Sequence, residues 1–232
     1  MASEYNFWSG TTAVWATAGN WSQGAPVTAD QVIIPRDSTQ AITGGDFTTG
    51  VTLASFTTEA GHSAALGSAA VPVQVVATIA NILGSGATYL SGTLTTLNLA
   101  NGSQVHIGYD NAGTAAAALT TVNMLSGTAR IVNSAITTCT IGGGTLTYGD
   151  PGRGTVAITT LTIEGTGKVV YNSNATIVTL NGRRGTLDLS GDTRAVTITT
   201  LNAWPGLRII DPQKRLSVTT LVPQAGLTMN FS

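Results

Sequence analysis

A short pattern of apolar and polar positions recurs along the C-terminal half of the chain: an apolar residue, two residues that are usually threonine, and a second apolar residue. The copies begin at Leu94, Leu119, Ile136, Ile158, Ile177, Ile198 and Val218. Successive copies start 25, 17, 22, 19, 21 and 20 residues apart. Similarity at an interval near twenty residues is typical of a solenoid, in which each repeat forms one coil. The runs that follow the copies alternate with a period of two, which predicts strands rather than helices.

The spacing within each copy indicates the shape of a coil. Side chains alternate between the two faces of a strand, so apolar residues three apart, such as Ile158 and Leu161, cannot both point inward along one straight strand. We therefore expect a bend at the Thr-Thr pair, then a second short strand, then a turn that contains Gly or Asn. Stacked coils of this kind form an all-β, single-stranded parallel β-helix, which we assign to residues 47–232.

Equivalent positions in stacked coils are expected to form columns along the solenoid. The predicted internal column consists of Leu97, Val122, Cys139, Leu161, Leu180, Leu201 and Leu221. The predicted outer polar column, one position further along each coil, consists of Asn98, Asn123, Thr140, Thr162, Asn181 and Asn202. Because Cys139 is the single cysteine, an intrachain disulfide is excluded, and its place in the apolar column favours a buried structural thiol over a nucleophile.

The coils between residues 47 and 92 are predicted from two apolar pairs with two smaller residues between them, Leu53–Phe56 and Ile79–Ile82. Further along, a joint rich in Gly and Ala at residues 114–118 lengthens one coil to 25 residues. Long turns of a solenoid often carry its variable binding surface.

Residues 1–46 differ from the repeats, because Trp8, Trp15 and Trp21 all lie there. The first coil of a solenoid exposes an apolar cross-section and an unpaired strand edge, and bulky tryptophan side chains can cover both. We therefore assign residues 1–46 as an N-terminal capping segment. The functional alternative is that the three tryptophans form an aromatic platform for sugars.

The passage FWSGTTAVWATAGNWSQGAPVTADQVIIP resembles the Trp-rich opening, W…W…NW..G..P…D.V.I, of β-helical proteins of bacterial surfaces and of bacteriophage virions. The resemblance covers about thirty residues. It implies a right-handed parallel β-helix, often trimeric in phages, and it carries over no catalytic residue.

Charge is sparse and unevenly distributed. Only 9% of the residues are charged, against about 25% in a typical globular chain. Two explanations stay open: Thr, Ser, Asn and Gly supply the polar surface, or partners cover much of it. Residues 1–150 carry two basic and seven acidic side chains, a net charge of −5, whereas residues 151–232 carry eight basic and four acidic ones, a net charge of +4. Because sequence order is spatial order in a solenoid, this predicts an acidic end and a basic end that could orient the protein on a partner.

Few residues offer catalytic or metal-binding chemistry. The only histidines, His62 and His106, have no Cys or acidic partner at metal-ligand spacing, so we expect solvated or turn residues and no metal or cofactor. Asp188 and Asp192 are the best candidates for the paired carboxylates of a polysaccharide-degrading enzyme. We nevertheless expect Asp188 to stack outward over Arg208 as an ion pair. The net charge of −1 and the lack of aromatic residues among the arginines argue against nucleic acid binding.

These observations predict a structural protein without enzymatic activity, most specifically a decoration or cement protein of a bacteriophage capsid, or a segment of a tail fibre or spike. The expected partners are further copies of the chain, as a homotrimer, and the major capsid protein or another virion protein. The virion is the expected location, since neither a signal peptide nor a membrane span is predicted. The alternating run Leu227, Met229, Phe231 predicts an open final coil. The alternative function is a bacterial surface protein that binds or degrades carbohydrate.

Overall fold

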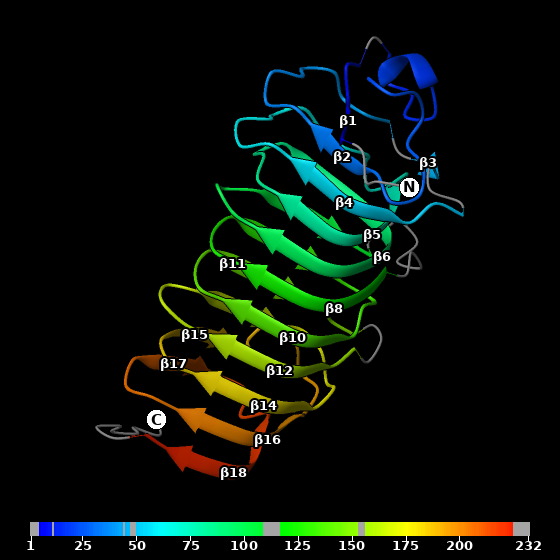
Figure 1. Ribbon diagram of the computed structural model, residues 1–232. Coiled ribbons are helices and arrows are strands. Elements are labelled where there is room, and N and C mark those ends of the chain that lie inside the picture. Colours follow the sequence, from blue (N-terminus) through cyan, green and yellow to red (C-terminus); the bar gives the residue numbers. More distant parts are fainter. Residues whose placement is uncertain are drawn as a thin grey trace.

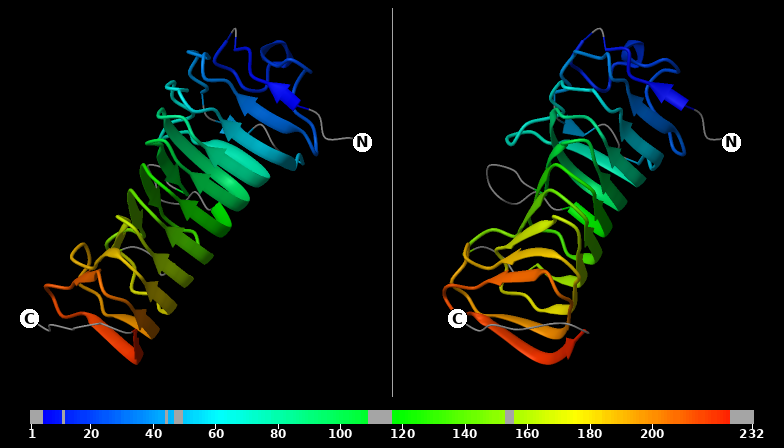
Figure 2. Two further views of the ribbon diagram at one scale, coloured as in Figure 1. Left: turned by 60° about the vertical axis from the view of Figure 1, so that its left-hand side comes forward. Right: turned by 90° about the vertical axis from the view of Figure 1, so that its left-hand side faces the viewer.

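The computed structural model describes residues 5–10, 12–43, 45–46, 50–108, 117–152 and 156–224. It is an all-β, parallel β-solenoid of about eight turns, as the repeat predicted. Every pairing between the named strands is parallel. The coils follow one another from the N-terminal segment to β18 at the opposite end (Figures 1 and 2). The run Leu227, Met229, Phe231 and most of the joint at residues 114–118 lie outside the described residues.

The strands form two stacks. The first stack contains β1 (Tyr5–Phe7), β2 (Gln31–Ile34), β4 (Leu53–Thr58), β5 (Val73–Ile82), β6 (Ala87–Leu99), β8 (Ala117–Met124), β10 (Ile136–Ile141), β12 (Ile158–Ile163), β14 (Ile177–Gly182), β16 (Val196–Ala203) and β18 (Leu216–Pro223). The second stack contains β3 (Gly45–Asp46), β7 (Gln104–Ile107), β9 (Thr128–Ile131), β11 (Thr145–Tyr148), β13 (Lys168–Tyr171), β15 (Gly185–Asp188) and β17 (Leu207–Ile210). Strands β5 and β6 are long enough to join both stacks: their N-terminal halves lie between β3 and β7. The sheet begins within residues 1–46, since β1 pairs with β2 and β2 with β4.

The bend expected at the Thr-Thr pair accounts for the burial pattern of the first stack. In β12, Ile158, Leu161 and Ile163 are buried, while Thr159 is exposed and Thr160 and Thr162 are half-buried. Both threonines of the pair therefore point away from the core, and the alternation resumes after them. Beta-branched threonine is well suited to such a pleated, half-buried surface.

Adjacent coils pair in register, and the predicted internal column forms a continuous line of directly paired residues from Leu97 to Leu221. It continues toward the N-terminus through Ala80 and Phe56 to Val32. From Val32 to Leu201 each member is at most 1% exposed, but Leu221 is 40% exposed. The expectation that Leu221 lies inside is therefore wrong, because no described strand pairs with the far edge of β18.

The register of one early coil also differs from the prediction. Leu53 pairs with Ala77 and Phe56 with Ala80, so the coil predicted to start at Ile79 starts two residues earlier. Ile79 occupies a threonine position of the repeat and points outward, 38% exposed. Alanine at both inward positions hid this coil from a search for large apolar residues.

Two buried tyrosines extend the core between the stacks. The rings of Tyr148 and Tyr171 are stacked, with centroids 5.5 Å apart. The hydroxyl of Tyr148 donates to the carbonyl oxygen of Ser134 at 2.7 Å, and that of Tyr171 to Ala175 at 2.9 Å. Burial raises the pKa of Tyr171 to about 12, so its hydroxyl stays protonated and can donate this hydrogen bond.

Glycine is required where consecutive corners touch. Gly127 has a φ of +95°, and a Cβ there would lie 2.4 Å from the carbonyl oxygen of Ser103. Gly144 has a φ of +76°, and a Cβ there would lie 2.3 Å from the carbonyl oxygen of Gly127. The glycines predicted to form turns thus allow the second strands to begin in tight contact with the preceding coil.

Replacement of an internal column residue should destabilise the whole stack. We expect Leu161→Ala to lower the free energy of unfolding by about 2–5 kcal/mol, because the side chain is fully buried between neighbouring coils. The exposed Thr159→Ala in the same strand is the control and should change it by less than about 0.5 kcal/mol. Urea unfolding followed by circular dichroism measures both. Equal midpoints for the two variants would contradict the assignment of the column as core.

Candidate interaction surfaces and polar clusters

The three tryptophans of the N-terminal segment form one aromatic cluster. The rings of Trp8 and Trp15 are stacked with centroids 5.8 Å apart, and Trp21 meets Trp15 edge-on at 4.5 Å. Trp15 also contacts Phe56 of the internal column, at 5.9 Å. All three tryptophans are at most 5% exposed. Their ring faces are therefore occupied by one another, which does not favour the alternative of a sugar platform.

Hydrogen bonds fix this cluster onto the first strand. The indole nitrogen of Trp21 donates to the carbonyl oxygen of Trp15 at 2.9 Å, and the buried Asn20 amide donates to Val14 at 2.7 Å. The backbone N–H of Ser22 donates to the carbonyl of Phe7 at 3.0 Å, on the side of β1 that faces away from β2. The segment around the cluster thus lies over the edge of β1.

Asp188 and Asp192 are both buried and both engaged. The carboxylate of Asp188 accepts hydrogen bonds from the backbone and hydroxyl of Ser190, at 3.0 and 2.6 Å, and pairs with Lys168 at 2.9 Å. The expectation that Asp188 stacks over Arg208 is wrong: Arg208 pairs with Thr186, and Asp188 with Ile210. Asp188 would lie over Arg208 only if strand partners were 20 residues apart, whereas β15 and β17 pair residues 22 apart, such as Gly185 and Leu207.

Asp192 is held by Arg194, whose guanidinium donates to both carboxylate oxygens, from Nε to Oδ1 at 3.2 Å and from Nη2 to Oδ2 at 2.6 Å. These bonds lower the pKa of Asp192 to about 2. Burial alone would raise the pKa of Asp188, but Ser190 and Lys168 together lower it below its usual range. A glycosidase of this type needs one carboxyl group whose pKa is raised, so that it can act as a general acid. The lowered pKa values of Asp188 and Asp192 do not favour that role.

Arg215 was weighed from the sequence only among the arginines of a nucleic acid site, but it is 6% exposed and joins three coils. Its guanidinium donates to the carbonyl oxygens of Leu189 at 2.9 Å, of Arg194 at 2.7 Å, and of Tyr171. Asp211 accepts from the backbone N–H groups of Arg215 and Leu216, at 3.1 and 2.9 Å. Sequence spacing offered no signal, because the carbonyls come from positions 21 to 44 residues away.

Neither histidine is fully solvated, although His62 closes a turn, as expected, with its backbone N–H donating to the carbonyl oxygen of Glu59 at 3.0 Å. His62 is 1% exposed, and its Nδ1 lies 3.2 Å from the carbonyl oxygen of Pro35. His106 lies in strand β7, with its ring stacked on Tyr89 at 4.4 Å and paired in register with Arg130. Burial lowers the pKa of both histidines, and the charge of Arg130 lowers that of His106 further.

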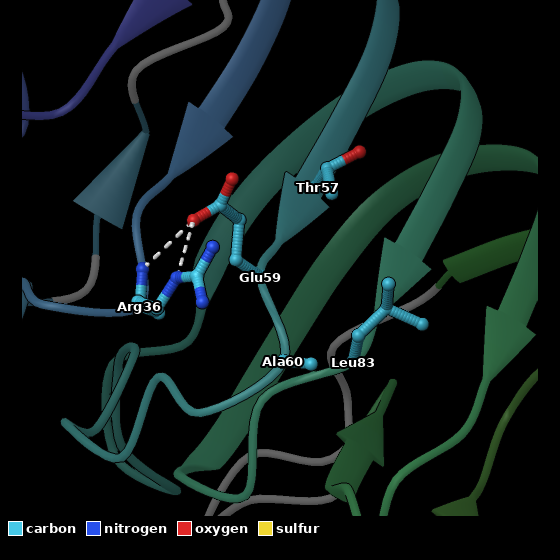
Figure 3. Close-up of a pocket in the computed structure, with 5 residues that line it drawn as sticks. All are labelled: Arg36, Thr57, Glu59, Ala60 and Leu83. Carbon is cyan, nitrogen blue, oxygen red and sulfur yellow. Dashed lines mark hydrogen bonds and ion pairs between the residues drawn. The ribbon is translucent and has the colours of Figure 1, made fainter.

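One shallow surface hollow lies beside the N-terminal coils. It is lined by Arg36, Thr57, Glu59, Ala60 and Leu83. Arg36 and Glu59 point toward each other across one side of it (Figure 3). The carboxylate of Glu59 accepts from the backbone N–H of Arg36 at 3.1 Å and lies 3.9 Å from its guanidinium. Because both side chains are solvated and paired with each other, the hollow offers little to hold a ligand.

The outer polar column forms a chain of amide hydrogen bonds. Asn123 donates to Asn98 at 3.0 Å, Asn98 to Asn81 at 2.8 Å, and Asn81 to the hydroxyl of Thr57 at 3.2 Å. A second run goes from Asn202 to Asn181 at 2.9 Å and on to Thr162 at 3.4 Å. Each donor belongs to the coil after its acceptor. The amides therefore bind neighbouring coils to one another on the outside of the first stack.

Within the described ranges no group of three or more His, Cys, Asp or Glu side chains could hold a metal ion. The same residues include no helix long and apolar enough to cross a membrane. Comparison of the chain with protein families, with curated proteins and with solved structures finds no match.

The lowered pKa values of His62 and His106 predict a loss of stability in mild acid. Because their pKa values are lower in the folded chain than the usual 6.5, the unfolded chain binds more protons below that pH. The contribution of the two histidines to stability is therefore fully present above pH 6.5, and it is lost as the pH falls toward their lowered pKa values. We expect the melting temperature of the wild type to drop between about pH 7 and about pH 5, and His62→Gln/His106→Gln to drop less.

Differential scanning calorimetry at several pH values measures this effect. The contribution of Asp192 lies at lower pH, because its pKa is lowered from 3.8 to about 2 in the folded chain. Identical pH slopes for wild type and double variant would contradict the assignment to the histidines.

Proposed function

We propose that the protein is a structural, non-enzymatic component that attaches to a larger protein assembly, most specifically a decoration protein of a bacteriophage capsid. The observation that carries the proposal is the difference between the two ends of the solenoid. The tryptophan cluster lies over the edge of β1 at one end, whereas β18 at the other end presents an edge with no described strand beside it. A tail-fibre or spike segment is a variant of the same proposal.

The exposed end combines apolar side chains with a strand, β18, that pairs with β16 and with no other described strand. Leu221 is 40% and Val222 37% exposed, and the threonines beside them are exposed as well. Unpaired strand edges are sites where another chain can add a strand. Such an edge supports attachment by the C-terminal coil.

Charge supports an oriented attachment. Arg208 and Lys214 are exposed near this end, while Asp30 and Glu59 belong to the first coils. A protein with this polarity approaches a charged surface preferentially with one end. The bacteriophage assignment rests in addition on the resemblance of the Trp-rich opening to virion β-helices. This resemblance also suggests a homotrimer and a location on the virion.

Attachment can be tested on purified particles of the phage that encodes the chain. We expect mass spectrometry to find the chain at a fixed ratio to the major capsid protein, and the purified chain to co-sediment with particles that lack it. Val222→Asp should abolish co-sedimentation, because it introduces a charge at the proposed contact. The matched control is Val178→Asp, which makes the same change at a side chain that is 47% exposed on the side of the solenoid.

Absence of the chain from purified particles, or binding that Val222→Asp leaves unchanged, would overturn the proposal. Turnover of anionic polysaccharides that Asp188→Ala abolishes would replace it with the enzymatic alternative.

The trimer can be tested separately by light scattering. We expect a mass of three 23.5 kDa chains that stays constant over a range of concentrations. A monomer under all conditions would limit trimerisation to the assembled particle or exclude it, which a count of copies per capsomer distinguishes.

A further inference from the structure

The outer surface of the first stack carries a regular array of threonine and asparagine, here called the threonine face. Its first column consists of Thr96, Thr121, Thr138, Thr160, Thr179, Thr200 and Thr220. Its second column, two residues further along each strand, consists of Asn98, Asn123, Thr140, Thr162, Asn181, Asn202 and Val222. Thirteen of these fourteen positions are Thr or Asn and none is charged, so the face is chemically uniform over seven coils.

The spacing of the array follows from its backbone. Members of one column are direct strand partners, so they repeat at about 4.8 Å along the solenoid. The two columns are two residues apart, which is about 6.7 Å across the face. The first positions of the pairs form a further row beside the first column; they are exposed threonines such as Thr137 and Thr159, except for Val178 and the half-buried Thr199. The result is a lattice of hydroxyl, amide and methyl groups about 30 Å long.

The side chains of this lattice have little freedom. Threonine is restricted at χ1 by its branched Cβ, and most members of both columns are half-buried by their neighbours. The amides of the second column are further fixed by hydrogen bonds between coils, such as Asn98 to Asn81. A ligand that matches the lattice would therefore meet groups that are already ordered.

The composition of the two columns limits the classes of ligand that the threonine face can bind. Protein interfaces depend on buried aromatic and arginine anchors, and neither occurs in the two columns. Sugar platforms need an exposed aromatic ring, and polyanions need cations. Because the face is neutral, charge complementarity calls for a neutral, periodic, hydrogen-bonding partner. Crystalline water has these properties, and its oxygen atoms repeat along one axis at nearly the spacing of adjacent strands.

We propose that the threonine face binds ice. Hydroxyl and amide groups hold water molecules at lattice positions, while the threonine methyl groups favour ordered water in the spaces between them. This ordered layer merges with the surface of an ice crystal. The proposal does not rest on attachment to a capsid, although the two surfaces share Thr220 and Val222 of β18.

Inhibition of ice recrystallisation by the purified chain tests the proposal. We expect the wild type to keep ice grains small at concentrations where an equimolar inert globular protein does not. Thr159→Lys places a long charged side chain at the middle of the face and should cause a several-fold loss of this activity. The control is Thr128→Lys, the same change at an exposed threonine of the second stack, which should keep it. Circular dichroism verifies that both variants fold.

The alternative occupant of the face is a second copy of the chain. If Thr159→Lys lowers the mass measured by light scattering while Thr128→Lys does not, the face is a subunit interface and the ice proposal fails. It also fails if the wild type acts no better than the inert protein, or if both variants retain full activity. The co-sedimentation test is separate, because Thr159 and Val222 lie three coils apart.

Discussion

In-register hydrogen bonding between successive parallel strands is the constraint on which the rest of this structure depends. Because Leu161 lies directly over Leu180 and Thr160 over Thr179, every property of one strand is repeated in the next. Inward positions become a continuous apolar column, and outward positions become lines of like polar groups. The amide chain on the outside is a product of the same register, since an Asn can reach the Asn of the preceding coil only when the two are strand partners.

The same hydrogen-bonding constraint explains why the two ends of the solenoid differ from its middle. Each inner strand has a partner on both sides, but a terminal strand has a partner on one side only. At the N-terminal end the residues around Trp8, Trp15 and Trp21 lie over the first coil. At the other end β18 keeps exposed apolar groups, which is the basis for proposing attachment there. The ends, and not the repeated middle, distinguish this solenoid from a uniform rod.

The repeated middle could be predicted from the sequence because its signal is local and recurs. A Thr-Thr pair between two apolar residues specifies a bend, and its recurrence specifies the partner strand without any knowledge of the turns. The corners could not be predicted in this way, since their lengths vary from coil to coil. Arg215 reaches the carbonyls of Tyr171, Leu189 and Arg194. Asp188 pairs with Lys168 instead of Arg208, because the register joins residues 22 apart and Arg208 is only 20 residues further along. The buried His62 likewise depends on the contact between two loops.

The interchangeable pairing of the central coils has a consequence for how such a protein can evolve. Residues 136–141 pair with 158–163 in the same way that 177–182 pair with 198–203. A gene duplication or deletion that adds or removes one whole coil therefore leaves all remaining strand partners matched. The length of the molecule can therefore change in steps of one coil. The tryptophan cluster and the terminal strand keep their sequences, and only the distance between them changes.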